Sequence, residues 1–248
     1  MKRDFVIGFG IVILSFLILV SVFSAIRPAQ VSQSNNSLQQ RNILINSATI
    51  NLPAVDNQGN GVIAKLKVQA IPGEGRLLTN IDNIFFWVDT QYSIRTAERV
   101  AQNITGADLS KIDLIYTIET DASLIEGGSA GAALTVATVA VLENKTLSHD
   151  VMITGTINPD GTVGPIGAVF AKAKAAKDVG TKLFLVPVGQ GSQVNYVPEK
   201  KCEQIGPVTL CTTEYKPQKL DISKDIGIEV KEVSNVQDAL NYFLGPSK

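Results

Sequence analysis

The residues that could perform chemistry begin with one serine in a glycine-rich segment. In Glu126-Gly127-Gly128-Ser129-Ala130-Gly131 this serine stands just before an apolar, helix-like run. Glycines let the backbone turn sharply and approach a substrate, and unpaired N–H groups at a helix start can bind an oxyanion. Serine is also a common helix N-cap, so a nucleophile and a capping residue both fit this position.

The base that would activate Ser129 is not expected to be a histidine. The segment matches Gly-x-Ser-x-Gly, the nucleophile elbow of α/β-hydrolases, which needs an acid and then a histidine later in the chain. The single histidine, His149, follows closely in a polar loop, and Glu143 is the sole carboxylate between it and the serine. We therefore expect no Ser-His-acid triad, and an ordinary exposed side chain at His149.

A lysine offers the alternative base. A serine can be activated by a lysine whose amine is desolvated, because burial makes the neutral amine accessible near pH 7. In the helical pattern over residues 167–178, Lys172 lies on the apolar stripe, whereas Lys174 and Lys177 lie on the other face. The residues that share the stripe of Lys172 are Ala168, Val169, Ala173, Ala176 and Val179. A lysine that extends its stem along a half-buried helix is the competing interpretation.

The elements that must position this pair alternate irregularly along the chain. Apolar alternation and β-branched runs predict strands at 48–52, 62–71, 84–88, 114–119, 152–157, 183–187 and 227–233. Helical spacing predicts helices at 92–102, 129–142, 167–178 and 236–244. We therefore predict one α/β (α+β) domain with a mixed sheet over residues 47–248.

The N-terminal part of the chain has the pattern of a membrane anchor. Residues 5–26 carry no charge, and a helix of this length crosses a hydrocarbon core about 30 Å thick. Lys2 and Arg3 precede the run, which favours a cytoplasmic N-terminus and an extracytoplasmic domain. We expect a single-pass transmembrane signal-anchor at 1–27 in the cell membrane and a polar tether at 28–46. A signal peptide cleaved before Ala25 is the alternative.

The long polar stretch at 190–223 indicates an insertion on the surface of the domain. It contains both cysteines, Cys202 and Cys211, on either side of Gly206-Pro207. That arrangement is typical of a hairpin which a disulfide could close, and such bonds persist in oxidising compartments. Two unpaired thiols remain the alternative.

Composition excludes several classes of function. Hydrophobic residues make up 45% of the 248 residues, which is enough for a folded core. With 22 basic and 23 acidic side chains the chain has no basic surplus for nucleic acid, so none is expected as a partner. One histidine and two cysteines are too few for a clustered zinc site, and we expect no metal or other cofactor.

Three blocks of sequence resemble the proteolytic domain of the Lon family, the Ser-Lys peptidases, and most of all its archaeal membrane-associated branch. The blocks are residues 126–157, 161–187 and 228–240, and the resemblance covers most of residues 48–244. It implies Ser129 as the nucleophile and Lys172 as the general base. It further implies that Thr154 orients the lysine amine, that Gly128 and Ser129 N–H groups bind the oxyanion, and that Glu126 modulates the loop form.

The chain also departs from the family pattern. Many members have proline or aspartate at the position of Gly128, and glutamate at that of Thr156. No Gly-x-x-x-x-Gly-Lys-Ser/Thr phosphate loop is present, so we expect no nucleotide partner.

The resemblance implies a serine endopeptidase and, by analogy, a homo-oligomeric ring. With the apolar run and the missing phosphate loop, it predicts a membrane-anchored, ATP-independent enzyme for unfolded or flexible polypeptides. A weak or inactive binding or assembly module, and a hydrolase of non-peptide esters or amides, are the alternatives.

Overall fold

The computed structural model describes residues 45–80, 88–120 and 127–245. All of them belong to one compact unit, residues 43–248. The predicted anchor at 1–27, most of the predicted tether at 28–46, and Glu126 lie outside the described residues. Among the described helices, none is long and apolar enough to cross a membrane.

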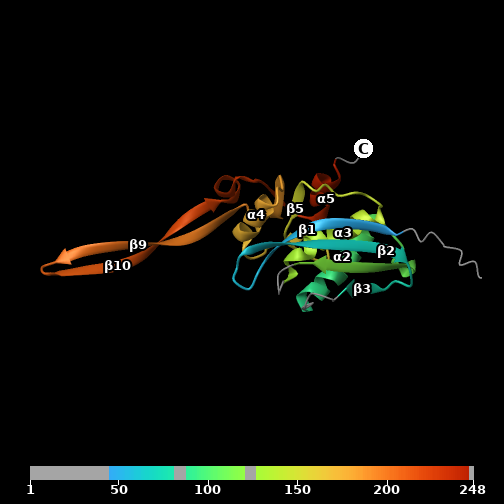
Figure 1. Ribbon diagram of the computed structural model, residues 1–248, viewed down its shortest axis with the longest axis horizontal. Helices are drawn as coiled ribbons and strands as arrows, with labels where there is room; N and C mark the ends of the chain where they lie inside the picture. The colour runs from blue at the N-terminus through green and yellow to red at the C-terminus, as the bar shows by residue number, and fades with distance from the viewer. Residues whose placement is uncertain (1–44, 81–87, 121–126, 246–248) are drawn as a thin grey trace, which may run out of the picture. The chain divides into compact units, whose positions relative to one another are not determined.

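A four-stranded mixed sheet forms one wall of the main hydrophobic core (Figure 1). Its strands are β1 (Asn46–Val55), β2 (Gly61–Pro72), β4 (Ile112–Glu119) and β3 (Leu77–Asn80), in that spatial order. β3 runs parallel to β4, and the other pairs are antiparallel. Alternate residues such as Ile50, Leu66 and Tyr116 are buried, because successive side chains of a strand point to opposite faces.

Helix α3 (Gly131–Leu142) is the centre of this core. It packs on β1 and β2, while α2 (Val88–Thr105) and α5 (Val236–Leu244) pack on it. Its sequence holds only glycine, alanine, valine, leucine and threonine, and its residues from Gly131 to Val141 are buried, as expected of a helix that is apolar on all sides. Thr135 and Thr138 satisfy their buried hydroxyls by donating to main-chain oxygens four residues earlier, at 2.8 and 2.7 Å.

A second sheet supports the helix that carries the lysine. β5 (Val151–Ile153), β8 (Leu183–Pro187) and β11 (Glu229–Val233) form a parallel sheet in the order β11-β8-β5. The crossover from β5 to β8 contains α4 (Val169–Asp178), as parallel neighbours require. A second hydrophobic cluster joins the two, with Met152 and Phe184 from the sheet and Ala173 and Ala176 from α4.

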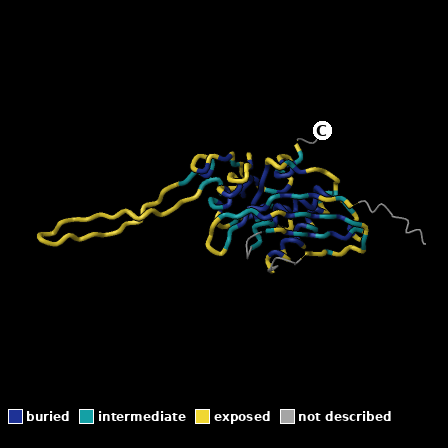
Figure 2. The backbone as a smooth tube through the Cα atoms, viewed as in Figure 1, coloured by how far each residue is buried: buried dark blue, intermediate teal, exposed yellow. Residues whose placement is uncertain are grey.

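The predicted insertion at 190–223 is a long two-stranded hairpin. β9 (Ser192–Ile205) and β10 (Val208–Asp221) pair antiparallel around Gly206-Pro207, with Gly206 at a positive φ of 62°. Cys202 and Cys211 face each other in this register and are joined by a disulfide. Nearly every residue of the hairpin is exposed (Figure 2). A π-helical turn, η3 (Ser223–Gly227), then returns the chain to the second cluster.

Several element boundaries differ from those predicted. The predicted strand at 84–88 lies mostly outside the described residues, and its last residue, Val88, begins α2 instead. The predicted strand at 152–157 is broken at Gly155, so that β6 (Thr156–Ile157) leaves the parallel sheet and pairs with β7 (Val163–Gly164). The single mixed sheet that we predicted is therefore divided into several smaller ones.

Asp113 organises the turn between β2 and β3. It is buried, and its carboxylate accepts hydrogen bonds from the N–H groups of Glu74 and Arg76 and from the Arg76 side chain, at 2.8 to 2.9 Å. The Arg76 side chain and these N–H groups lower the pKa of Asp113 to about 2. A Cβ on Gly73 would overlap the carboxylate, so this position requires glycine.

We expect Asp113→Asn to lower the melting temperature at neutral pH. Because the pKa of Asp113 is lowered in the folded state, its contribution is present above the ordinary carboxylate pKa and is lost as pH falls toward about 2. The variant should therefore lose less stability than the wild type over that acidic range, which thermal unfolding at a series of pH values measures. Equal pH profiles for the two proteins would contradict this role.

Candidate active site

The glycine-rich segment forms a tight entry into α3. Ser129 lies in the short 3-10 turn η2 (Gly128–Ala130), directly before that helix. Gly127 has φ 99° and ψ 159°, a backbone conformation that residues other than glycine rarely adopt. A Cβ on Gly131 would come within 2.8 Å of the main-chain nitrogen of Ile157, so glycine lets α3 approach β6 closely. The predicted helix start at Ser129 is thus replaced by a turn that leaves its side chain half-buried.

Helix α4 brings Lys172 to this serine. The Nζ atom of Lys172 lies 2.7 Å from the Oγ atom of Ser129, and the two groups form a hydrogen bond. Lys172 is only 3% exposed, and burial lowers its pKa to about 8. The neutral amine is therefore accessible near physiological pH. A proton can pass from the serine hydroxyl to that amine without any rearrangement of the two side chains.

The predicted apolar stripe on α4 is correct at its centre. Val169, Ala173 and Ala176 are buried with Lys172, whereas Lys174 and Lys177 are exposed as predicted. Ala168 and Val179 are exposed because they flank α4: Ala168 precedes its first residue and Val179 follows its last. Lys177 also donates to the main-chain oxygen of Ile226 in η3.

The Thr154-Gly155 turn holds the main chain of the nucleophile. Gly155 N–H donates to the Ser129 carbonyl oxygen at 3.0 Å, and the Gly155 carbonyl accepts from Ala132 N–H at 3.0 Å. We predicted that the Thr154 hydroxyl would orient the lysine amine. Instead it donates to the Ser129 carbonyl oxygen at 3.4 Å, and among the described residues no hydrogen bond joins it to Lys172. Thr154, which is fully buried, therefore acts on the serine side of the pair.

Ser93 in α2 is a further contact of the site that the sequence did not indicate. Its hydroxyl lies 3.5 Å from the carbonyl oxygen of Gly128, at the limit of a hydrogen bond, and the residue is 4% exposed. A Cβ on Gly128 would lie 3.4 Å from Ser93 Oγ and 3.7 Å from the Thr156 side chain. The two positions that depart from the family pattern, Gly128 and Thr156, are thus neighbours in space.

The N–H groups of Gly128 and Ser129 were predicted as oxyanion donors. Among the described residues, neither donates in the hydrogen bonds that tie loops and turns together. The first N–H groups of a helical turn have no partner within that turn, which is the property that an oxyanion donor needs. Glu126, the predicted modulator, lies outside the described residues.

Gln190 fixes the start of α4. Its side-chain amide makes two hydrogen bonds with the main chain of Ile166, at 2.9 and 2.8 Å. Ala168 then takes a left-handed conformation, with φ 55°, and its carbonyl accepts from Lys172 N–H at 3.1 Å. A pocket of about 300 Å³ lies beside this corner, lined in part by Gly189, Ser192 and Gln193. No sequence pattern indicated this role for Gln190.

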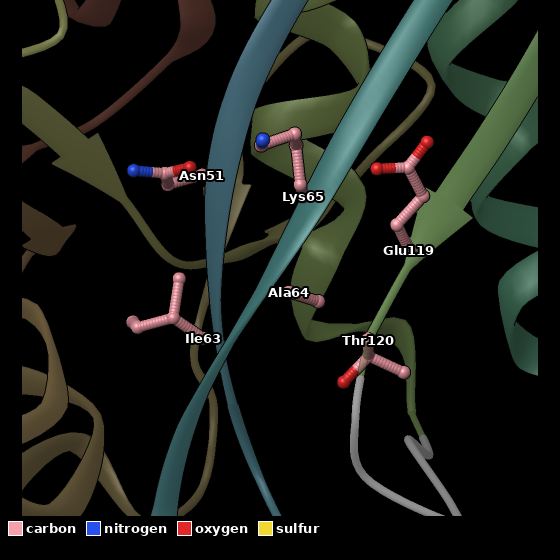
Figure 3. A pocket seen from close by; sticks show the side chains of 6 residues that line it. All are labelled: Asn51, Ile63, Ala64, Lys65, Glu119 and Thr120. Atoms are coloured by element: carbon pink, nitrogen blue, oxygen red, sulfur yellow. The ribbon is translucent and has the colours of Figure 1, made fainter.

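A second, polar pocket of about 260 Å³ opens where β4 ends (Figure 3). Its lining includes Lys65 and Glu119, which are paired across β2 and β4, and Asn51 on β1. Thr120 also lines this pocket and precedes Ser129 in the chain.

His149 has an exposed side chain, as predicted. Within the described residues, no three His, Cys, Asp or Glu side chains gather as a metal site would need.

In this geometry a half-buried serine hydroxyl is hydrogen-bonded to a buried lysine amine. Comparison with known sequences identifies the family: residues 59–214 match the Lon protease (S16) C-terminal proteolytic domain. The chain belongs to this family, which confirms the resemblance. The mixed α/β architecture agrees with such a domain, and the family supports a peptidase activity.

The relatives are longer proteins. The chain is 24% identical to an archaeal Lon protease of Thermoplasma acidophilum and 25% identical to one of Thermococcus kodakarensis. These matches cover 65% and 78% of this chain but 26% and 30% of the relatives. A Lon protease of Phenylobacterium zucineum is 27% identical over 56% of the chain and 18% of its own length. The chain therefore spans less than a third of these relatives.

We expect Lys172→Met to be inactive yet more stable than the wild type below pH 8. The pKa of Lys172 is lowered from 10.5 to about 8, so the charged amine destabilises the fold at every pH below about 8. Replacing it with an apolar side chain of similar length should gain roughly 1–3 kcal/mol there. Urea unfolding at pH 7 and pH 10 measures the gain, which should shrink at the higher pH. A destabilised variant at pH 7 would mean that Lys172 is structural.

We expect Gly131→Ala to destabilise the domain by roughly 1–3 kcal/mol, because its Cβ would overlap the main chain at Ile157. Gly167→Ala is the matched control, since no atom lies within 4 Å of a Cβ there and its φ is not positive. Chemical denaturation of both variants provides the test. Similar stability losses in the two variants would show that the close approach of α3 to β6 is unimportant.

Proposed function

We propose that this protein is a serine endopeptidase in which Ser129 is the nucleophile and Lys172 the general base. The observation that carries the proposal is the 2.7 Å contact between Ser129 Oγ and the amine of Lys172, a residue that is only 3% exposed. Membership of the Lon proteolytic-domain family supports peptide bonds as the target. A binding module would have no need of a desolvated amine at a serine hydroxyl.

Catalysis would begin when neutral Lys172 accepts the Ser129 proton. The serine oxygen then attacks the carbonyl carbon of the peptide bond, and the resulting oxyanion is bound by the N–H groups of Gly128 and Ser129. The lysine ammonium returns its proton to the leaving amine, which gives an acyl-enzyme. Water, deprotonated by the same lysine, hydrolyses that ester and restores the serine.

Thr154, Gly155 and Ser93 would act as positioning residues. Thr154 and Gly155 hold the Ser129 carbonyl, and Ser93 contacts the carbonyl of Gly128. The Gly128 carbonyl shares a peptide group with the Ser129 N–H, so the Ser93 contact would hold that oxyanion donor, whereas Thr154 and Gly155 would hold the peptide group that follows Ser129. Such preorganised donors need no reorientation as charge develops, which is how they lower the barrier.

We further propose a substrate class, which takes account of the missing phosphate-loop motif. Without a phosphate-loop motif in the chain, cleavage would proceed without ATP and would act on unfolded, flexible or membrane-adjacent polypeptides. The apolar run at 5–26 would anchor the domain in the cell membrane with its catalytic part on the extracytoplasmic side. A disulfide in the hairpin supports an oxidising location. We also propose a homo-oligomer, with Glu126 modulating the form of the loop before Ser129.

The test is hydrolysis of casein, without ATP, by the wild type, Ser129→Ala, Lys172→Ala and the control Lys174→Ala. We expect the first two variants to lose at least about a thousandfold in kcat, and Lys174→Ala, which alters an exposed lysine of the same helix, to retain activity. A panel of chromogenic esters run in parallel separates peptide from ester hydrolysis. An inert wild type of confirmed oligomeric state would favour the binding-module alternative.

The pH profile tests the role of the lysine. Since the neutral amine is the base, kcat/KM should rise with pH and level off above the pKa of about 8. Rates measured across pH 6 to 10 on an uncharged peptide substrate would show this limb. A profile that is flat over this range would contradict Lys172 as the titrating base.

A further inference from the structure

The β9–β10 hairpin has two faces of different chemistry. Residues paired across an antiparallel ribbon point to the same face, and successive pairs alternate between the two faces. The pair Cys202–Cys211 therefore lies on one of them, which we call the disulfide face. The large apolar and aromatic side chains that share this face with the disulfide are those of Val194, Tyr196, Pro198, Tyr215 and Pro217.

The disulfide face is apolar and open to solvent. Val194, Tyr196 and Tyr215 are 53%, 68% and 66% exposed, and both prolines are exposed as well. Figure 2 shows the hairpin exposed along nearly its whole length, so the rest of the described domain does not cover this face. Single exposed apolar side chains are ordinary on a protein surface, but several that share one face mark an interaction site.

The charges of the hairpin divide between its two faces. Residues 192–221 contain four acidic and four basic side chains, yet all three glutamates lie on the face opposite to the disulfide, at Glu199, Glu203 and Glu214. The fourth acid, Asp221, lies at the base and is ion-paired with Lys224. Between the base and the disulfide, the charged residues of the disulfide face are Lys200 and Lys219. Neither lysine has an ion-pair partner among the described residues.

The outer edges of the ribbon disfavour the addition of another strand. Pro198 and Pro217 lie on different strands but in the same class of pair, opposite Tyr215 and Tyr196. Because proline has no N–H to give to the ladder, it takes a position whose N–H would point away from the partner strand. Each outer edge therefore lacks one of the donors that an added strand would need. We expect a partner to pack on the disulfide face instead of extending the sheet.

The size of the disulfide face suits a short segment better than a second folded protein. From Val194 to Cys202 the face extends about 26 Å, and two strands are about 10 Å wide. A stable interface between two proteins buries roughly 800 Å² per partner, which is well above what a face of these dimensions offers. An extended polypeptide segment of about eight residues has the same length as the face.

We propose that the disulfide face binds an extended segment of a substrate polypeptide, apolar in its middle and acidic at both ends. This step rests on the proposed function, which makes polypeptides the substrates. Lys219 is paired with Val194, so Lys200 lies six residues further along the ribbon, or about 20 Å away. Two carboxylates six residues apart in an extended segment would meet both amines. The apolar side chains between them would contact Tyr196 and Tyr215.

The base of the hairpin adjoins the helix that carries Lys172. Ser192 and Gln193, at the start of β9, line the pocket of about 300 Å³ together with residues 166–169, where α4 begins. Lys172 follows one turn later in the same helix. A polypeptide held on the disulfide face would therefore have a raised effective concentration at this side of the site. The hairpin would lower KM without taking part in the chemistry.

The experiment measures binding in the full chain carrying Ser129→Ala, so that no cleavage intervenes. The probe is fluorescein-labelled Asp-Thr-Phe-Thr-Val-Thr-Asp, and fluorescence anisotropy gives its Kd. We expect Tyr196→Ser/Tyr215→Ser to weaken binding at least about tenfold, because aromatic side chains dominate such contacts. Val197→Ser/Leu210→Ser is the matched control, since these side chains are 44% and 54% exposed but lie on the opposite face.

A second probe separates the charges from the apolar contact. It has the same sequence with asparagine in place of both aspartates. Lys200→Gln/Lys219→Gln should weaken binding of the acidic probe several-fold and leave binding of the uncharged probe unchanged. Lys201→Gln alters a lysine of the opposite face and should leave binding of both probes unchanged.

The proposal is overturned if the acidic probe does not bind, if the tyrosine variant binds it as well as the parent does, or if the opposite-face control loses as much affinity. It is also overturned if the tyrosine variant has a lower molecular mass in sedimentation velocity while its probe binding is unchanged. A second copy of the chain would then be the occupant of the disulfide face.

These outcomes are separable from those of the proposed function, because the parent protein of the binding assay carries Ser129→Ala and needs no peptidase activity. In the active chain, Tyr196→Ser/Tyr215→Ser should raise KM for a peptide that contains the acidic segment and leave kcat unchanged. Normal probe binding by a chain that cleaves no peptide would contradict the proposed function alone.

Discussion

The desolvation of Lys172 is the physical constraint on which the site depends. A lysine amine in water is charged near neutral pH and cannot accept the proton of a serine. Burial in α4 against the second hydrophobic cluster lowers its pKa to about 8, and the same burial makes the charged form costly to the fold. In the proposed mechanism, the burial that makes this amine a proton acceptor therefore also lowers the stability of the fold. The apolar contacts of the second cluster must offset the free-energy cost of keeping this lysine buried beside Ser129.

Much of the architecture serves to keep two elements at a fixed separation. Ser129 lies in η2, directly before α3, which is buried on all sides in the main core. Lys172 lies on α4, which packs in the second cluster. The Thr154-Gly155 turn connects these regions, because Thr154 N–H donates to Leu185 in β8 while Gly155 bonds to Ser129 and Ala132. A shift of either sheet would be transmitted to the 2.7 Å contact. Glycines at 131 and 155 permit this spacing, since a Cβ at either would collide with a neighbour.

The sequence predicted the reactive pair better than its supports. Helical spacing alone placed Lys172 on the apolar side of α4 and Lys174 on the exposed side, because a helix face is fixed by local periodicity. Strand β8 and helix α5 were also predicted at their observed bounds, because each follows a local pattern of apolar residues. The contacts of Thr154, Ser93 and Gln190 join segments far apart in the chain and depend on tertiary packing, which no local pattern encodes. The break at Gly155 was also missed, since an apolar run hides a glycine that is needed for close approach.

The hairpin leaves and rejoins the domain without taking part in its core. β9 and β10 leave the domain at Ser192 and return at Asp221, and the residues between contribute nothing to either hydrophobic cluster. Because an added loop costs free energy only slowly as it lengthens, such an insertion is tolerated at a surface position. Its own stability has to come from within, through the disulfide and the two cross-strand ion pairs.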